Sequence, residues 1–244
     1  MINIVLPMAG DGSRFSNAGF KKAKPFIDVD GLPMITRVLK NLYFPGVNFY
    51  LIVREEHRAN EPGVIREIEN QFPVRLIPIQ NKTEGAACTV LSARTFIDND
   101  APLLMANSDQ IVDVKINDFV DDCFTRGLDG SIMTFKDKDM NPKWSFAKIG
   151  PDQLVVSVKE KEPISSYATV GIYLFSKGKD FVGAAIDMIV RNDRVKNEFY
   201  ICPVYNYAIR DGKRIGIYDI EPDRMHGLGT PEDLKDYLKI RSNK

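Results

Sequence analysis

The first half of the chain alternates short apolar runs with segments of helical periodicity. Apolar runs fill 1–8, 49–53, 74–79 and 103–106, and each has the length of a buried strand. Apolar residues recur at helical spacing over 33–42, where Pro33 falls in the first turn, and over 64–72, 86–97 and 116–124. Because parallel strands need crossover helices, this succession predicts a mostly parallel sheet with helices on both faces.

The second half has a different pattern. Strand-like runs at 130–135, 154–159 and 168–175 have no helical segment between them, which favours antiparallel pairing. Helices are predicted at 181–190 and 201–209, a strand at 215–219, and a last helix with Thr230 as N-cap and Pro231 in first position. The whole chain, 1–244, therefore indicates one α/β domain: a Rossmann-like, mixed but mostly parallel sheet with a smaller antiparallel substrate lobe.

Composition excludes several classes of protein. The 33 basic residues balance 33 acidic ones, so no positive excess is available for nucleic acid, which we exclude as a partner. The first apolar run contains Pro7 and is too short to span a bilayer or to act as a signal peptide, so we expect no membrane partner and a cytoplasmic protein. Three cysteines, Cys88, Cys123 and Cys202, are too widely spaced to indicate a disulfide framework or a zinc site.

A glycine-rich loop follows the first predicted strand, with the sequence Met-Ala-Gly-Asp-Gly-Ser-Arg-Phe over 8–15. Gly10 and Gly12 permit a turn whose backbone N–H groups converge on an anion, and Arg14 adds a planar donor for phosphate oxygens. The alternatives are a tight turn without a ligand and a dinucleotide-binding fold. The second is disfavoured because Phe15 replaces the third glycine and 16–19 is predicted to continue the loop.

A candidate cation lies ten residues after Arg14, at Lys24. Pro25 favours an extended backbone at Lys24, and the apolar Phe26 and Ile27 should anchor the segment against the core. A lysine held in this way beside a phosphate-binding loop is suited to contact a reacting phosphate, whereas most isolated lysines are solvated surface charges.

These motifs together resemble the nucleotidyltransferases that activate sugar phosphates and similar phosphorylated metabolites. The N-terminal signature combines the glycine loop, Lys24-Pro25 and the Gly-Leu-Pro-Met sequence at 31–34. Weaker similarities follow at 84–87, 107–109, 160–163, 170–173 and 227–230. The resemblance implies a nucleotidyltransferase or glycosyltransferase-A-like fold, with 1–128 mainly binding nucleotide and 129–244 mainly binding the acceptor.

The resemblance also implies roles for individual residues. Arg14, Lys24 and Lys161 are the candidate catalytic residues. Nucleotide contacts are implied for Leu6, Met8, Ala9, Gly10, Gly12, Ser13, Arg14, Gly85, Ala86 and Ser108. Acceptor contacts are implied for Glu160, Lys161 and Gly171; we add Trp144 as a candidate wall, with a core position as the alternative, and Glu198 as a candidate partner for a substrate ammonium. Without the resemblance, 160–162 is typical of a solvated charge run.

Asp109 is the candidate ligand for Mg²⁺. It follows the predicted strand at 103–106, at the carboxyl edge where open α/β sheets bind ligands, although an aspartate there also suits a turn. The resembling family often supplies a second carboxylate two residues before its closing Gly-Thr, and that position is Gly227 here. Asp223 and Asp113 are the alternative second ligands, or phosphates and water complete the shell. His226 is assigned a structural role.

Finer features at 107–110 and 229–234 resemble cytidylyltransferases of capsule and lipo-oligosaccharide pathways. That resemblance implies CTP as the nucleotide and L-glutamine phosphate as the acceptor, with release of pyrophosphate and no general base. A hexose-1-phosphate uridylyl-, thymidylyl- or cytidylyltransferase is the alternative. A nucleotide-sugar glycosyltransferase would usually carry an Asp-x-Asp pair, whereas Asn107 and Ile111 flank Asp109. A non-catalytic nucleotide-binding module and the formation of homo-oligomers also stay open.

Overall fold

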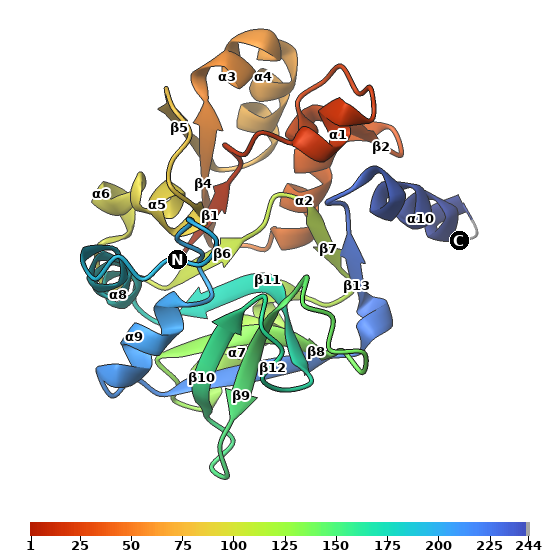
Figure 1. The fold of residues 1–244 in the computed structure, drawn as a ribbon. Helices are drawn as coiled ribbons and strands as arrows, with labels where there is room; N and C mark the ends of the chain where they lie inside the picture. The colour runs from red at the N-terminus through yellow and green to blue at the C-terminus, as the bar shows by residue number, and fades with distance from the viewer. Residues whose placement is uncertain (243–244) are drawn as a thin grey trace.

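A nine-stranded mixed sheet forms the centre of the protein, whose computed structural model describes residues 1–242 (Figure 1). The strands run in the order β10-β9-β11-β6-β1-β4-β5, β8 pairs with β11, and β12 pairs with β8. Their bounds are β1 Ile2–Pro7, β4 Val47–Arg54, β5 Val74–Ile79, β6 Leu103–Ala106, β8 Gly130–Lys136, β9 Ser145–Ile149, β10 Val155–Glu160, β11 Tyr167–Phe175 and β12 Ile215–Ile220. Two small sheets pair β2 (Asp28–Val29) with β3 (Leu32–Pro33) and β7 (Gln110–Val112) with β13 (Met225–Gly227).

The N-terminal part of the sheet is parallel, as the alternating pattern predicts. Strand β1 lies parallel to both β4 and β6, and β5 lies parallel to β4. Strand β11 joins the two halves of the chain, because it pairs antiparallel with β6 on one side and with β8 and β9 on the other. The predicted fold class, including the antiparallel lobe, is confirmed.

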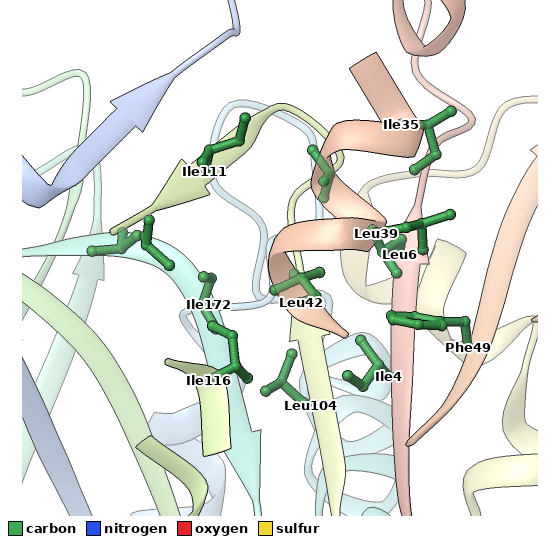
Figure 2. Packing of buried hydrophobic residues seen from close by; sticks show 14 of the residues in the cluster. Ile4, Leu6, Ile35, Leu39, Leu42, Phe49, Leu104, Ile111, Ile116 and Ile172 are labelled. Atoms are coloured by element: carbon green, nitrogen blue, oxygen red, sulfur yellow. The ribbon is translucent and has the colours of Figure 1, made fainter. Parts of the chain in front are cut away.

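Helices cover both faces of the sheet. Their bounds are α1 Ser13–Asn17, α2 Met34–Leu42, α3 Glu55–Asn60, α4 Pro62–Gln71, α5 Ala86–Leu91, α6 Arg94–Ile97, α7 Ile116–Thr125, α8 Gly178–Val190, α9 Val204–Arg210 and α10 Pro231–Ser242, with short 3₁₀ helices η1 Lys24–Phe26 and η2 Pro222–Arg224. Alternate residues of β1 enter two separate apolar clusters: Ile4 and Leu6 pack toward α2, and Val5 packs toward α5 and α8. Figure 2 shows the first cluster, in which Leu39 and Leu42 of α2 lie against β1.

Several local predictions need correction. A short helix, α1, extends from Ser13 to Asn17 and so includes the first two residues of 16–19, where the sequence predicts that the loop continues; its burial of Phe15 explains why a short helix forms there. Lys24 starts a 3₁₀ turn, and the extended residue is Ala23 instead. Pro33 is the N-cap of α2 and belongs to β3, so the helix begins one residue later than predicted.

Other differences concern element count. The helix predicted over 86–97 is divided into α5 and α6 by a turn at Ser92–Ala93. Helix α3 and strands β7 and β9 are missing from the sequence-based prediction because each is too short to show a period of its own. Within residues 1–242, no helix combines the length and the apolar character needed to cross a membrane.

Candidate active site

Two cavities meet at the carboxyl edge of the parallel strands. The smaller, of about 260 Å³, lies between the glycine loop, η1 and the segment after β6; it is lined by Pro7, Met8, Gly10, Gly12, Lys24, Pro25, Ala86, Asn107, Ser108 and Asp109. The larger, of about 750 Å³, extends toward the antiparallel lobe and the start of α10. Ala86, Asn107 and Asp109 line both, so the cavities form one continuous candidate site.

The glycine loop is fixed by the backbone conformation of Gly12 and by the ion pairs of Asp11. Gly12 has φ of 60° and packs against Lys24, because a Cβ at Gly12 would lie 3.0 Å from the Lys24 Cβ. Asp11 accepts hydrogen bonds from Arg54 at 3.0 Å and from Lys82 at 2.8 Å. The hydrogen bond from Lys82, with the charge of Arg54, lowers the pKa of Asp11. Arg14 lines the larger cavity and makes no side-chain hydrogen bond or ion pair within residues 1–242, so its guanidinium is available to an anion.

Asp109 occupies the junction of the two cavities. The Lys24 ammonium donates a hydrogen bond to its carboxylate, and each of the two side chains is 21% exposed. The Asp109 carbonyl accepts a hydrogen bond of 2.7 Å from the backbone N–H of Leu228, which ties the strand edge to the loop before α10. The predicted anchoring of Lys24 is confirmed, because Phe26 and Ile27 are both buried.

The far end of the larger cavity contains a buried carboxylate. The Glu160 side chain is only 7% exposed, accepts a hydrogen bond from the Ser145 hydroxyl, and has the Lys161 ammonium at 3.8 Å. Burial raises the pKa of Glu160, while Ser145 and Lys161 oppose that rise. Lys161 donates to the Tyr200 hydroxyl and lies over the Tyr200 ring at 4.3 Å. The pKa of Tyr200 is raised by burial and by its hydrogen bond with Glu198.

Gly171 forms the floor of the larger cavity because it has no side chain. Its φ is 94°, and a Cβ there would lie 2.2 Å from Gln110 Oε1 and 2.3 Å from Asn107 Nδ2. Those two side chains are joined by a 3.0 Å hydrogen bond across the glycine. The backbone N–H of Asn107 also donates to the Gly171 carbonyl at 3.0 Å. The glycine is therefore required by the packing around it, independently of any contact with substrate.

The structure brings most of the predicted site residues together. Met8, Gly10, Gly12, Lys24, Ser108 and Asp109 line the smaller cavity, and Arg14, Trp144, Glu160 and Gly171 line the larger one. Trp144 also packs edge-on against Phe135, so its two predicted positions, in a wall and in the core, coexist. Leu6, Ala9, Ser13, Gly85, Lys161 and Glu198 line neither cavity, although Ala86 next to Gly85 lines both. Glu198 acts on the site through its hydrogen bond with Tyr200 and through its charge, which contributes to the raised pKa of Glu160.

The backbone of Phe199 leaves no room for a side chain at Gly85. A Cβ at this position would lie 2.4 Å from the Phe199 carbonyl oxygen, because the backbone of Phe199 pairs with the segment around it. The Phe199 N–H donates to the Glu84 carbonyl, and the Ala87 N–H donates to the Phe199 carbonyl. The segment predicted to approach the base is thus fixed to the loop that carries Glu198.

The acidic residues fit a divalent cation only in part. Within the described residues, no three His, Cys, Asp or Glu side chains converge in the manner of a metal centre. Asp223 lies in η2, at the end of β13 remote from Gly227, and lines neither cavity. Asp113 contacts His226, with 3.0 Å between Oδ2 and Nε2. Asp109 and Asp233, by contrast, both line the larger cavity, and a Cβ on Gly229 would lie 3.1 Å from Asp109 Oδ2 and 3.8 Å from Asp233 Oδ2. The protein therefore offers two carboxylates beside Gly229, a number that Mg²⁺ commonly takes.

Sequence reasoning missed several residues of this site. Tyr200 and Cys202 line the larger cavity together with Glu160, and Glu232 and Asp233 line it from the first turn of α10. The capping signal at Thr230 located the start of α10, but no sequence signal shows that this start faces Asp109 across the sheet edge. The Asp11 ion pairs join the glycine loop to the end of β4 at Arg54 and to Lys82 in the loop after β5, and they have no local pattern.

A family model described as nucleotidyl transferase matches residues 2–206. The chain belongs to the nucleotidyl transferase family. The match includes the glycine loop, the lining of the smaller cavity and part of the lining of the larger one, and stops before β12 and α10.

Relatives within the family include larger and similar-sized proteins. The bifunctional protein GlmU of Methanococcus aeolicus is 26% identical over 176 residues, which are 71% of this chain and 40% of that protein. The GlmU of Methanococcus maripaludis strain C5 is 24% identical over 88% of this chain and 49% of its own length. The chain thus spans about half the length, or less, of these GlmU proteins. UTP–glucose-1-phosphate uridylyltransferase AglF of Haloferax volcanii is 24% identical over 94% of this chain and 92% of its own.

Solved structures show the same fold over nearly the whole chain. A nucleoside-diphosphate-sugar pyrophosphorylase from Vibrio cholerae superposes with a TM-score of 0.81 at 26% identity, covering 97% of this chain and 99% of that one. A glucose-1-phosphate thymidylyltransferase, described as putative, from Bacillus anthracis gives 0.79 at 20% identity, covering 100% and 96%. The inositol-1-phosphate CTP transferase of T. maritima gives 0.71 at 16% identity, covering 98% and 96%.

Proposed function

We propose that this chain transfers a nucleoside monophosphate from a nucleoside triphosphate to a small phosphorylated acceptor and releases pyrophosphate. The observation that carries this proposal is the junction of the two cavities, where Lys24 and Asp109 lie between a glycine loop and a larger, partly polar chamber. The nucleotide would lie over the smaller cavity with its phosphates at the junction, where Arg14 lines the adjoining larger cavity. The acceptor would occupy the rest of the larger cavity with its phosphate pointing toward the junction.

The reaction needs little acid–base chemistry. An oxygen of the acceptor phosphate bonds to the α-phosphorus while the bond from that phosphorus to the bridging oxygen breaks, and pyrophosphate leaves with the electron pair. The attacking oxygen is already anionic, so alignment and charge neutralisation are the main requirements. Two unit charges 4 Å apart repel by about 4 kcal/mol at an effective dielectric of about 20, so cations are needed to bring the phosphates together.

Residues at the junction supply this neutralisation. Arg14, which has no side-chain partner among residues 1–242, and the loop amides would hold the phosphates that become pyrophosphate. Lys24 would contact the α-phosphate and the incoming phosphate. Lys161 is the second candidate for the acceptor phosphate, available once its contact with Tyr200 opens. Mg²⁺, when bound at Asp109, would supply further positive charge for the phosphate oxygens.

The proposed nucleotide is CTP. The proposed acceptor is a phosphorylated metabolite that can donate hydrogen bonds to Glu160, and L-glutamine phosphate is the first choice. This choice is supported by the sequence resemblance to capsule-pathway cytidylyltransferases and by the buried carboxylate at the far end of the acceptor cavity. A hexose-1-phosphate uridylyltransferase is the second candidate. It is favoured by the relative named for UTP and glucose 1-phosphate, which matches this chain over nearly its full length.

A matrix of four nucleoside triphosphates against phosphorylated acceptors tests both candidates. Glutamine phosphate, choline phosphate, inositol 1-phosphate and glucose 1-phosphate are each supplied with Mg²⁺, and released pyrophosphate is measured. We expect release with CTP and an amino-acid phosphate. Release with UTP and glucose 1-phosphate alone would favour the second candidate. No release with any pair would contradict nucleotidyl transfer.

A further inference from the structure

Two residues of the segment before α10 that lie near Asp233, Gly227 and Gly229, have no side chain. Gly227 ends strand β13 and Gly229 precedes the Thr230 N-cap. A Cβ on Gly227 would meet Asp233 Cγ at 3.8 Å and Oδ2 at 3.9 Å, with nothing closer. Gly227 also lacks a positive φ, so neither space nor backbone conformation requires a glycine here. The Asp233 carboxylate stands at ordinary contact distance from the place that a side chain at 227 would occupy.

Asp233 approaches Asp109 across Gly229. A Cβ on Gly229 would lie 3.1 Å from Asp109 Oδ2 and 3.8 Å from Asp233 Oδ2, so the two carboxylate oxygens are no further apart than the sum of those distances. Both residues line the larger cavity. Two carboxylates converging in this way repel one another unless a cation lies with them.

The backbone around both carboxylates is fixed. The Asp233 N–H donates to the Thr230 hydroxyl at 3.1 Å, which sets the first turn of α10. The Leu228 N–H donates to the Asp109 carbonyl, and Gly227 pairs with Gln110 in the β13–β7 ladder. The approach of the two side chains is therefore built into the sheet edge and the helix start.

The two carboxylates differ in how their charge is balanced. Asp109 has the Lys24 ammonium, whereas the Asp233 carboxylate makes no hydrogen bond or ion pair within residues 1–242. An acid in the third position of a helix often bonds back to the N-cap N–H, but here the only bond between Asp233 and Thr230 runs from the Asp233 N–H to the hydroxyl. Asp233 is thus left as an oxygen donor in the lining of the larger cavity.

We infer that Asp233 is the second protein ligand of a divalent cation at Asp109, and that it takes the place of a carboxylate missing at Gly227. This inference rests on the metal dependence included in the proposed function. It also replaces Asp223, the alternative suggested by the sequence, which lines neither cavity. The cation concerned is a hard, oxygen-seeking ion such as Mg²⁺ or Mn²⁺.

Binding of Mn²⁺ to the full chain without substrates tests this ligand assignment, with free Mn²⁺ followed by electron paramagnetic resonance. We expect Asp233→Asn to weaken Mn²⁺ binding at least tenfold. Asp223→Asn, which removes the same charge from the same C-terminal segment, should stay within twofold of wild type. The double variant Gly227→Asp, Asp233→Asn should recover most of the affinity, because it returns a carboxylate to the same space.

Three results would overturn the inference: unchanged binding in Asp233→Asn, a loss in Asp223→Asn instead, or no recovery in the double variant. A wild-type chain that binds no Mn²⁺ would also overturn it. Circular dichroism of each variant shows whether a loss of Mn²⁺ binding is caused by unfolding. If Asp233→Asn unfolds, Mn²⁺ binding by the double variant provides the second measurement. Because the readout is metal binding without turnover, a failed pyrophosphate assay contradicts the proposed function and leaves this test intact.

Discussion

The Lys24 ammonium and the Asp109 carboxylate form an ion pair at the point where the two cavities join. Lys24 comes from η1 and Asp109 from the segment after β6, so the pair connects elements 85 residues apart in the chain. Without ligands each group neutralises the other. Binding of polyphosphate and a cation would separate them, giving Lys24 a phosphate partner and Asp109 a metal partner.

Replacing Lys24 should therefore affect catalysis and metal binding in opposite directions. Lys24→Ala removes a cation from the reacting phosphates, and we expect turnover to fall by at least about 100-fold, as for loss of one strong electrostatic contact in a transition state. The same change removes the cation that competes for Asp109, so Mn²⁺ should bind the substrate-free variant more tightly. Pyrophosphate release and Mn²⁺ titration measure the two effects.

Lys22→Ala is the matched control for this variant. Lys22 lies two residues earlier, pairs with Glu61 at 3.6 Å, and has a side chain that is 56% exposed. It should leave both measurements near wild type. Near-normal turnover in Lys24→Ala would remove Lys24 from the reaction centre.

Adding a methyl group at Gly171, in strand β11, should both destabilise the fold and weaken acceptor binding. Gly171→Ala places a Cβ within 2.3 Å of Asn107 and Gln110 and forces alanine to φ of 94°. Backbone strain of this kind costs about 1–3 kcal/mol, so we expect a lower free energy of unfolding and a rise in the acceptor KM as the two amides move. Chemical denaturation and steady-state kinetics provide the measurements.

Gly183→Ala is the control for the glycine effect itself. Gly183 lies inside α8, and a Cβ there would have nothing within 4 Å. Alanine should stabilise that helix by about 0.5–1 kcal/mol and leave the kinetics unchanged. If Gly171→Ala were as stable as wild type, the close packing described here would be wrong.

The sequence predicts the sheet better than it predicts the site. Strands β5 and β6 fall at their predicted bounds because short, mostly apolar runs between turn residues are a local signal. The glycine loop and Asp109 were found because a strand end is visible in the sequence. The approach of Asp233 to Asp109 depends on how the loop after β13 packs, and no local pattern encodes that distance.

The error at 16–19 depends on tertiary burial. The sequence predicts that the loop continues there, but α1 extends to Asn17 because Phe15 is buried in a core assembled from distant strands. Burial also decides between the two interpretations of Glu160: a solvated charge run is wrong, because this side chain is only 7% exposed. Tertiary burial is the information that a single sequence carries least directly.

The buried Glu160 should make stability depend on pH. Burial raises its pKa, so protonation favours the folded state, and its contribution to stability is present at low pH and lost as pH rises through the folded-state pKa. Glu160→Gln cannot ionise, and we expect it to melt higher than wild type at pH 7. That difference should shrink as pH falls below the ordinary glutamate range. Thermal melts from pH 4 to pH 8 measure it.

Activity should respond in the opposite sense. Glu160→Gln removes the carboxylate proposed to hold the acceptor, so kcat/KM for the acceptor should fall while the KM for the nucleotide changes little. Glu162→Gln is the control, because Glu162 is 62% exposed and its one ion pair within the described residues 1–242 is with Lys159 at 3.6 Å. A Glu160→Gln variant with a lower melting temperature at pH 7 would show that the carboxylate stabilises the fold.

Removing the negative charge of Asp11 should strengthen binding of the product pyrophosphate. Asp11 is half exposed and holds Arg54 and Lys82 beside the glycine loop through contacts of 3.0 and 2.8 Å. Exposed pairs of this kind contribute about 0–1 kcal/mol, so Asp11→Asn should fold normally. The variant loses a negative charge and frees Lys82 from this ion pair, whereas Arg54 keeps its ion pair with Glu56. We expect pyrophosphate to inhibit the variant about two- to threefold more tightly at low salt.

Salt provides the internal check on that expectation. The Debye length falls from about 30 Å at 0.01 M to about 10 Å at 0.1 M ionic strength, so the difference between Asp11→Asn and wild type should narrow across that range. Asp100→Asn is the control, because it breaks an exposed ion pair with Lys179 just before the N-terminal end of β6, whereas the site lies at the carboxyl end. Its inhibition by pyrophosphate should equal that of wild type at every salt concentration. Unchanged or weaker inhibition of Asp11→Asn by pyrophosphate at low salt would mean that the charges of Arg54 and Lys82 do not contribute to polyphosphate binding.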